Sequence, residues 1–274
     1  IEHLHADRKN HKAFCRAIVK ENERYKMEIK DIIKTGKAEA VNTALIDAAG
    51  GGSLLVIKKL FKKRGDDIDV NAVDSEGNTA LFKSSMHGYI GITTFLLQIK
   101  GIDVNKPETE HGATPLIGAS QQGYVGIVKL LLSAEGINVN QSMKEGCTPL
   151  IMASIDGHIE IVKLLVGAEG IEINQPMNDG VAPLLLASIN GYVEIVTILL
   201  SAEGINVNQS MKEGATPLII ASQKNHIEIV KLLLGAEGIE INQPTNDGAT
   251  ALAMAKQEKH KEIVQLLAAA GATE

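Results

Sequence analysis

The residues of this chain that could do chemistry are few and lie far apart. The cysteines Cys15 and Cys147 are 132 residues apart, and His3, His5 and His11 gather near the N-terminus. A zinc site needs four ligands in closely spaced pairs, which this spacing does not supply. The three histidines could offer imidazoles to a metal, although a terminus that happens to contain histidines is the commoner case. A catalytic Cys147 would need a histidine partner, and none recurs in register with it.

Other catalytic motifs are incomplete or absent from the sequence. The only glycine run, Gly50-Gly51-Gly52, lacks the Lys-Ser/Thr that follows a phosphate-binding loop. The sequence contains no His-Glu-x-x-His, nucleophile elbow or paired-carboxylate signature. We therefore predict that the chain is not an enzyme and that it uses no cofactor, metal or small-molecule substrate.

Composition and charge narrow the class further. The 274 residues are 45% hydrophobic but only 3% aromatic, with no Trp. A protein that binds nucleic acid by stacking bases on aromatic rings normally has more of them. Residues 1–64 carry 15 Lys and Arg against 8 Asp and Glu, whereas residues 65–274 carry 12 against 25. This division predicts a basic N-terminal module ahead of an acidic body, which argues against a nucleic-acid partner. Without an apolar run of membrane-spanning length or a visible secretory signal, and with so few cysteines, we expect a protein of the cytoplasm.

An internal repeat determines the expected fold. Variants of Gly-Ala-Thr-Pro-Leu recur at intervals of 36, 35, 34, 34, 34 and 34 residues, with their leucines at Leu45, Leu81, Leu116, Leu150, Leu184, Leu218 and Leu252. Seven units of one supersecondary element are the signature of a solenoid.

Each unit predicts the same local structure, as the third one illustrates. Thr114 is a helix N-cap, Pro115 takes the first helical position, and Gly123 ends the helix in a left-handed conformation. A second helix is predicted over roughly 125–133, and the alternating residues 137–140 predict an extended arm into the next unit. Helices this short are marginal alone, so stacking on neighbouring units must stabilise them.

The repeated motif resembles the ankyrin repeat. Thr-Pro-Leu-x-x-Ala, then Gly-His or Gly-Tyr, then Ile-Val-Lys-Leu-Leu-Leu and Val-Asn follow the family pattern over roughly residues 38–270. The resemblance implies an all-α solenoid of helix-turn-helix units joined by β-turn finger loops. It also implies that the Asn of each Val-Asn pair is a structural turn residue, although some members carry a hydroxylation there. These are Asn71, Asn105, Asn140, Asn174, Asn208 and Asn242.

The chain departs from the family pattern in two ways. The family's His after Thr-Pro-Leu is replaced by Ile46, Phe82, Ile117, Ile151, Leu185, Ile219 and Ala253, and most units carry one extra residue near Glu-Gly-Ile. The first change replaces a polar link between repeats with apolar packing. The rings in the slot after the first helix of each unit are expected to be structural rather than ligands, namely Tyr89, Tyr124, His158, Tyr192 and His226.

The two ends differ from the middle units. We predict a helical capping segment over 1–37, followed by an ankyrin-repeat domain over 38–274 whose last repeat is a C-terminal cap with a polar outer side. A helix over 11–34 would place Phe14, Ile18, Tyr25, Ile29 and Ile32 in one apolar stripe. This stripe either covers the first repeat or docks onto a domain upstream of Ile1, since a chain that begins with Ile fits a piece of a longer protein.

The basic cluster at Lys58, Lys59, Lys62, Lys63 and Arg64 lies on the second helix of the first unit. It could attract anionic lipid, nucleic acid or an acidic protein. We favour a solvated helix face, because neither an aromatic strip nor a second basic strip accompanies it, and expect neither a membrane nor a nucleic acid as partner.

A two-repeat duplication points to the expected binding surface. Residues 132–176 align without gaps on 200–244, and six of the 45 pairs differ, three of them (147, 155 and 156) on the face that ankyrin repeats usually present to partners. Those positions are either selected for contact or simply tolerant of change. We predict an apolar centre with a polar rim, formed by Glu145, Cys147, Ile155, Asp156, Asp179, Val181, Ile189, Asn190, Gln223 and Lys224.

The predicted function is that of a monomeric module that binds another protein on its concave finger and inner-helix face. The alternative is a targeting or substrate-recruiting domain of a longer enzyme, or of a bacterial effector that acts in the host cytosol.

Overall fold

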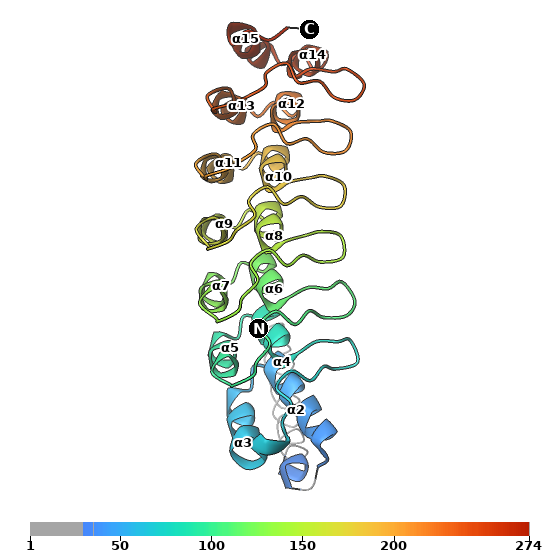
Figure 1. Cartoon of the computed structure of the whole chain (residues 1–274), viewed down its shortest axis with the longest axis vertical. Helices are drawn as coiled ribbons and strands as arrows, with labels where there is room; N and C mark the ends of the chain where they lie inside the picture. Colours follow the sequence, from blue (N-terminus) through green and yellow to red (C-terminus); the bar gives the residue numbers. More distant parts are fainter. Residues whose placement is uncertain (1–29, 35, 274) are drawn as a thin grey trace, which may run out of the picture.

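The computed structural model describes residues 30–34 and 36–273, which form a straight two-column stack of helices (Figure 1). The inner column holds the first helix of each repeat: α2 (Ala38–Gly50), α4 (Ala80–Met86), α6 (Pro115–Gln121), α8 (Pro149–Ile155), α10 (Pro183–Asn190), α12 (Pro217–Gln223) and α14 (Ala251–Gln257). The outer column holds the second: α3 (Leu54–Arg64), α5 (Ile90–Leu97), α7 (Val125–Leu132), α9 (Ile159–Val166), α11 (Val193–Leu200), α13 (Ile227–Leu234) and α15 (Lys261–Ala269). A short 3-10 turn, η1 (Gly65–Asp67), follows α3.

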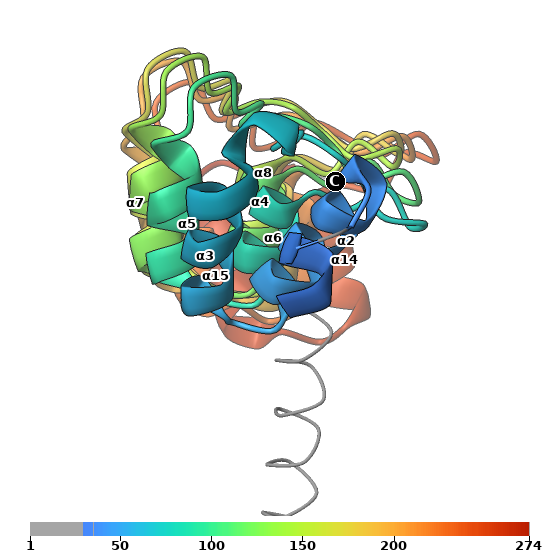
Figure 2. The same cartoon turned by 90° about the horizontal axis from the view of Figure 1, so that it is seen from below.

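The loop between an outer helix and the next inner helix, called the finger below, projects on the side away from the outer column (Figure 1). Viewed end-on, the fingers of successive repeats all project to the same side of the stack (Figure 2). The all-helical repeat fold predicted from the sequence is therefore confirmed, and the described residues contain no strand. The stack is straight, however, and lacks the curvature that a concave binding face would need (Figure 1).

Local sequence explains where each helix begins and ends. The Thr114 hydroxyl accepts the N–H of Ile117, and the same cap recurs at Thr79, Thr148, Thr216 and Thr250. Gly123 ends its repeat's inner helix at a φ of 77°, as predicted. A Cβ at this glycine would lie 2.7 Å from the ring of His158, so the next repeat's ring packs against it. The tyrosines and histidines of this slot are therefore packing residues.

One hydrophobic core runs between the two columns for their whole length. It is built from fully buried Leu, Ile, Val and Ala side chains, such as Leu116, Ala119, Ile127 and Leu131 in the third repeat. A small residue at the centre of each inner helix, Ser84 in α4 and alanine in the others, lets neighbouring inner helices approach closely. Stacking thus buries the face that each short helix pair could not bury alone.

The arm after each outer helix differs from the extended segment that the sequence predicts. In the third repeat it forms tight turns, because the Asn138 side-chain oxygen accepts the Asn140 N–H at 3.0 Å. The Asn140 side chain then reaches the next repeat, donating to the Gly170 carbonyl at 2.7 Å and accepting the Glu172 N–H at 2.9 Å. Both bonds recur from Asn71, Asn105, Asn174 and Asn208.

The described end of the N-terminal segment is anchored on the first repeat. Ile32 and Ile33 pack against the core, and the Arg64 guanidinium donates to the carbonyls of Ile32 and Gly36 at 3.2 and 2.8 Å. Four residues of the predicted stripe lie outside the described residues: Phe14, Ile18, Tyr25 and Ile29. The capping role and the boundary at residue 37 therefore stay predictions. At the other end, Lys256, Gln257, Glu258, Lys259 and Lys261 are exposed.

Replacing Asn140 with alanine is expected to lower the free energy of unfolding by about 1–2 kcal/mol, since it removes two hydrogen bonds between repeats. Urea unfolding followed by circular dichroism measures the change. The matched control is Glu135→Ala, an exposed residue in the same arm. Equal stability of Asn140→Ala and the control would show that the asparagine contacts do not join the repeats energetically.

Candidate functional site

The candidate site lies on the finger side of the inner column, where the fingers meet the inner helices. A second apolar cluster follows this face through repeats two to five, separate from the main core. Its buried members are Phe82, Ala113, Ile117, Cys147, Ile151 and Met152, and its partly exposed members are Met86, Met143, Ile155, Met177 and Leu186. We call these residues the finger-face cluster. The partly exposed members are accessible to solvent, so they form an apolar surface above the buried members.

The residues predicted from the sequence fall at three depths on this face. Glu145, Asp156, Asp179, Asn190 and Lys224 are exposed, and Ile155, Ile189 and Gln223 are half-buried. Cys147 and Val181 are only 8% and 6% exposed. Both precede an N-cap and pack inward beneath their fingers, so they form the floor of this face, and their role in partner binding stays a prediction.

The environment of Cys147 also disfavours nucleophilic chemistry. Burial raises the pKa of its thiol, and the charges of Glu145 and Asp179 raise it further. The thiol consequently stays protonated at neutral pH, whereas a nucleophile needs the thiolate.

The fingers differ in the residue at which each one turns back toward its inner helix. In the third repeat this residue is Glu108, whose carboxylate accepts the N–H groups of Glu110, His111 and Ala113 at 2.6–2.9 Å. Burial alone would raise the pKa of Glu108, but these donors outweigh it and hold the pKa below its ordinary value. Asp74 occupies the same position in the second repeat and accepts the N–H groups of Glu76 and Asn78.

Repeats four to six place methionine at this turn position, as Met143, Met177 and Met211. A thioether cannot replace the carboxylate as an acceptor of three N–H groups. Each methionine is half-buried, and Met143 and Met177 belong to the finger-face cluster. These fingers thus lack the hydrogen bonds that the carboxylate accepts within the turn. In its place they have a flexible apolar side chain of the kind common at protein-binding surfaces.

A hollow of about 480 Å³ opens in the face where α6 carries Gly118. At the same position the other inner helices have Asp47, Lys83, Met152, Leu186, Ile220 and Met254. Without a side chain there, the space is lined by Phe82 and Met86 from α4, Gln121 from α6, and Met143 and Glu145 from the next finger. It has the size and apolar floor to take one large side chain of a partner.

The finger tips surround this apolar surface with negative charge. Each tip carries one exposed carboxylate, at Glu76, Glu110, Glu145, Asp179, Glu213 and Asp247. The ammonium group of Lys144 is held by the carbonyls of Thr109 and Glu110 at 2.9 and 2.7 Å. The face is thus apolar along its centre and acidic along its rim.

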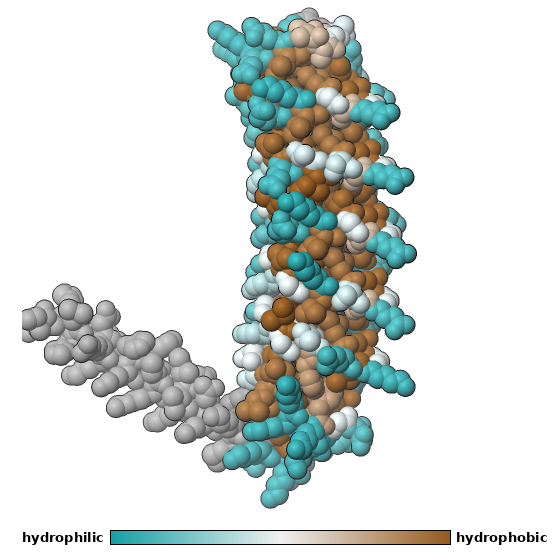
Figure 3. All heavy atoms as spheres, turned by 90° about the vertical axis from the view of Figure 1, so that its left-hand side faces the viewer, coloured by the Kyte–Doolittle hydropathy of each residue, from teal (hydrophilic) through white to brown (hydrophobic). Residues whose placement is uncertain are grey.

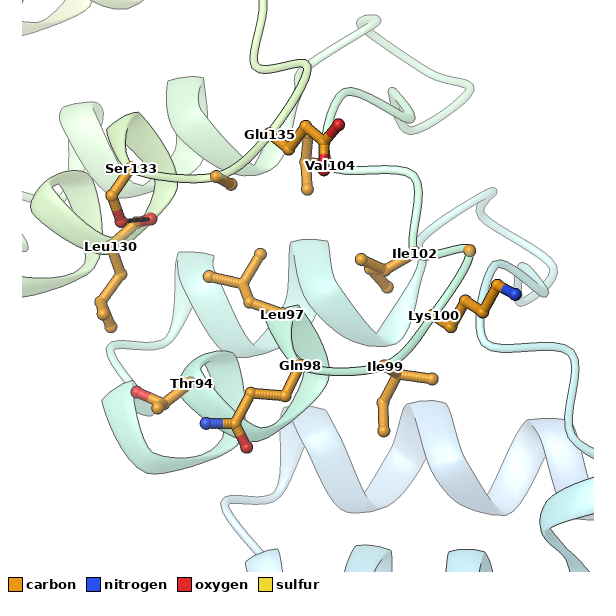
Figure 4. Close-up of a pocket in the computed structure, with 12 residues that line it drawn as sticks. Thr94, Leu97, Gln98, Ile99, Lys100, Ile102, Val104, Leu130, Ser133 and Glu135 are labelled. Atoms are coloured by element: carbon orange, nitrogen blue, oxygen red, sulfur yellow. Dashed lines mark hydrogen bonds between the residues drawn. The ribbon is translucent and has the colours of Figure 1, made fainter.

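Larger hollows on the opposite side belong to the architecture rather than to a site. One lies between α5 and α7, where Leu97, Ile102, Val104 and Leu130 border it and the Ser133 hydroxyl donates to the Leu130 carbonyl at 2.7 Å (Figure 4). Corresponding residues line a similar hollow between α11 and α13. A space that recurs with the repeat reflects how outer helices stack.

Within residues 30–34 and 36–273, no three His, Cys, Asp or Glu side chains are placed to hold a metal. His3, His5 and His11 lie outside these residues. None of the described helices combines the length and apolarity needed to cross a membrane.

The fold and this face define a helical repeat protein of the kind that binds partners along one side. The family model for ankyrin repeats (three copies) matches residues 3–108, 45–143, 116–211 and 184–273. The chain belongs to the ankyrin-repeat family, whose repeats are generally protein–protein interaction modules. No curated protein matches the chain.

Sequence reasoning missed the most distinctive part of the face. Phe82, Met86, Met143, Met177 and Leu186 were not singled out, and neither was the missing side chain at Gly118. Two signals could have found them: methionine recurring at one turn position in consecutive units, and a glycine inside a helix where the other units have large side chains.

Glu108→Gln is expected to lower the free energy of unfolding by about 1–2 kcal/mol at pH 7, because an uncharged amide is a weaker acceptor for the three N–H groups. The pKa of Glu108 is lowered on folding, so its stabilisation is fully present above the unfolded pKa of about 4.3 and is lost as pH falls through the folded pKa. The gap between wild type and variant should therefore close in acid, as measured by urea unfolding at neutral and acidic pH.

The exposed Glu237→Gln serves as the control and should match wild type at both pH values. A gap for Glu108→Gln that stayed constant across the pH range would contradict the assignment.

Proposed function

We propose that this chain binds another protein on the finger face, with a partner segment seated along the finger-face cluster. The observation that carries the proposal is the contiguous apolar surface of Met86, Met143, Ile155, Met177 and Leu186, opened at one point by the hollow over Gly118. Exposed apolar surface rimmed by polar residues is the usual anatomy of a protein-binding patch.

The proposed contacts keep the exposed and half-buried residues predicted from the sequence. Ile155 and Ile189 supply apolar contact, and Gln223, Lys224, Asp156 and Asn190 lie at the open ends of inner helices. Glu145 and Asp179 contribute to the acidic rim. Cys147 and Val181 support this surface from beneath.

The charge and shape of the face select a class of partner segment. Carboxylates on successive finger tips attract lysine and arginine, and the hollow over Gly118 accommodates a large apolar side chain. The favoured ligand is therefore a basic segment that carries one bulky apolar anchor.

Selection of a random-peptide library on the purified chain tests this proposal. The selected peptides are expected to share a large apolar residue flanked by Lys or Arg. Gly118→Met should weaken their binding about tenfold to a hundredfold, because it fills the space that the anchor occupies. Ile155→Lys combined with Ile189→Lys should also weaken binding.

Gly118→Met installs the residue that α8 has at the same position, so it should leave the fold intact. An added Cβ would lie 3.3 Å from Met86 Sδ, the mobile end of a flexible side chain, and replacing a helical glycine favours the helix by about 0.5–1 kcal/mol. Lys100→Ala, on the opposite side, is the matched control. Peptides without the basic–apolar pattern, or peptides that bind Gly118→Met as tightly as wild type, would overturn the proposal.

A further inference from the structure

The outer face of the first repeat combines positive charge with exposed apolar surface. Along α3, Leu55, Lys58, Lys59, Lys62 and Lys63 follow the i, i+3, i+4, i+7, i+8 spacing of one helix face, and all five are exposed. None of the four lysines forms an ion pair within the described part of the chain. The stripe is thus an uncompensated row of ammonium groups that begins at a leucine.

Arg64 shows that this arrangement is not simply a consequence of a basic helix. Its guanidinium turns inward, donating to Asp67 at 2.7 Å and to the carbonyls of Ile32, Ile33 and Gly36. The structure therefore uses the arginine internally and leaves the lysines, and only the lysines, on the open face.

The next two outer helices continue the same character. Across α3, α5 and α7 no residue is Asp or Glu, and apart from Arg64 the charged residues are the four lysines and Lys129. Gly91 and Gly126 stand where the later outer helices have Glu160, Glu194, Glu228 and Glu262.

Those later helices neutralise their outer face with ion pairs. Lys163 lies 3.1 Å from both Glu160 and Glu194, and Lys231 lies 2.8 Å from Glu228 and 3.7 Å from Glu262. Stacking therefore does not require glycine or excess positive charge here. The N-terminal three outer helices depart from a pattern that the same fold supports elsewhere.

The first turns of α3 and α5 expose large apolar side chains. Leu55 is 66% exposed and Ile90 is 50% exposed. A Cβ added at Gly91 would lie 3.6 Å from Leu54, and one added at Gly126 would lie 2.9 Å from Ile90, so these residues form a continuous strip at the first turns of α3, α5 and α7. Figure 3 shows this outer face, which is largely hydrophobic along the column and carries hydrophilic side chains at several heights, including the lower end where α3 lies.

We propose that the outer face of α3, α5 and α7 docks onto the surface of an anionic lipid bilayer. Lys58, Lys59, Lys62 and Lys63 lie against the headgroups, while Leu55 and Ile90 enter the interfacial region. Clusters of this size on a helix bind anionic membranes, because each lysine contributes about 1 kcal/mol near the charged surface and apolar side chains add burial.

Two features favour a bilayer over an acidic protein or a nucleic acid. Lysine ammoniums are compact, hydrated point charges that suit a plane of many headgroups, whereas arginine favours paired recognition of single carboxylates or phosphates. The projecting side chains are aliphatic, and no aromatic ring on this face is exposed for base stacking. The absence of an aromatic strip, which favoured a solvated face, thus argues against nucleic acid only.

The charge of the remaining repeats would also orient the docked chain. Residues 65–274 carry 25 Asp and Glu against 12 Lys and Arg, so an anionic surface repels the body of the array. Docking therefore takes place through the N-terminal outer helices. The fingers, on the opposite side of the stack, stay accessible (Figure 1).

Co-sedimentation of the full chain with large unilamellar vesicles tests the proposal. Phosphatidylcholine vesicles with about 30% phosphatidylserine should bind the chain, pure phosphatidylcholine vesicles should not, and binding should fall as salt is raised. Lys58→Gln combined with Lys62→Gln should lower the partition coefficient about thirtyfold, since each lysine is worth about fivefold. Leu55→Ser, which changes no charge, should lower it about tenfold.

Lys212→Gln combined with Lys261→Gln is the control, because it removes the same charge from exposed sites away from this face. Equal binding to both kinds of vesicle, or equal losses in the control and the Lys58/Lys62 variant, would overturn the proposal. So would binding to polyglutamate or duplex DNA through these lysines without binding to phosphatidylserine vesicles. All variants change exposed residues, and circular dichroism verifies their folding. None of these outcomes bears on peptide binding at the finger face, so the two proposals fail separately.

Discussion

The paired hydrogen bonds of the arm asparagines are the constraint on which the rest of this structure depends. Five of the six arm asparagines donate to a carbonyl and accept an N–H from the following repeat, as Asn140 does with Gly170 and Glu172. One side chain thereby fixes both the distance and the rotation between two repeats. Because a solenoid repeat contacts only its neighbours, no more distant contact can correct a misplaced unit. The same two bonds at successive arms therefore produce a straight and regular stack.

Regular stacking turns positions in the repeat into rows on the surface. Side chains at one register position lie above one another, so a change in a single row alters a whole face without disturbing the core. The finger-turn row changes from carboxylate in Asp74 and Glu108 to methionine at Met143, Met177 and Met211, which exchanges internal hydrogen bonds for apolar surface. The outer-helix row changes from glycine at Gly91 and Gly126 to glutamate in later repeats, which exchanges an open apolar strip for ion pairs. Both changes leave the asparagine bonds intact.

The period of 34 residues, the threonine caps and the glycine stops were predictable because each depends on one residue and its immediate neighbours. Thr114 caps its helix and Gly123 ends it wherever the stack places them. How deeply each side chain of the finger face is buried was less predictable. Cys147 and Val181 lie in the register of the finger face, yet only the packing of the finger over the inner helix buries them. The hollow over Gly118 depends on three repeats at once, since α4, α6 and the fourth finger all line it. The sequence pattern of a single repeat therefore cannot predict a hollow whose lining comes from three repeats.

The two proposed surfaces belong to opposite sides of one rigid core, and this separation has a physical consequence. The core between the columns is continuous from the first repeat to the last, so neither surface must be disrupted for the other to be occupied. Their charges differ in sign: the fingers end in carboxylates, whereas the outer face of α3 presents lysines. A basic partner segment is attracted to the first and repelled by the second, and an anionic surface behaves in the opposite way. Electrostatics alone thus keeps the two ligands on their own faces, and it does so most strongly at low salt, where screening is weakest.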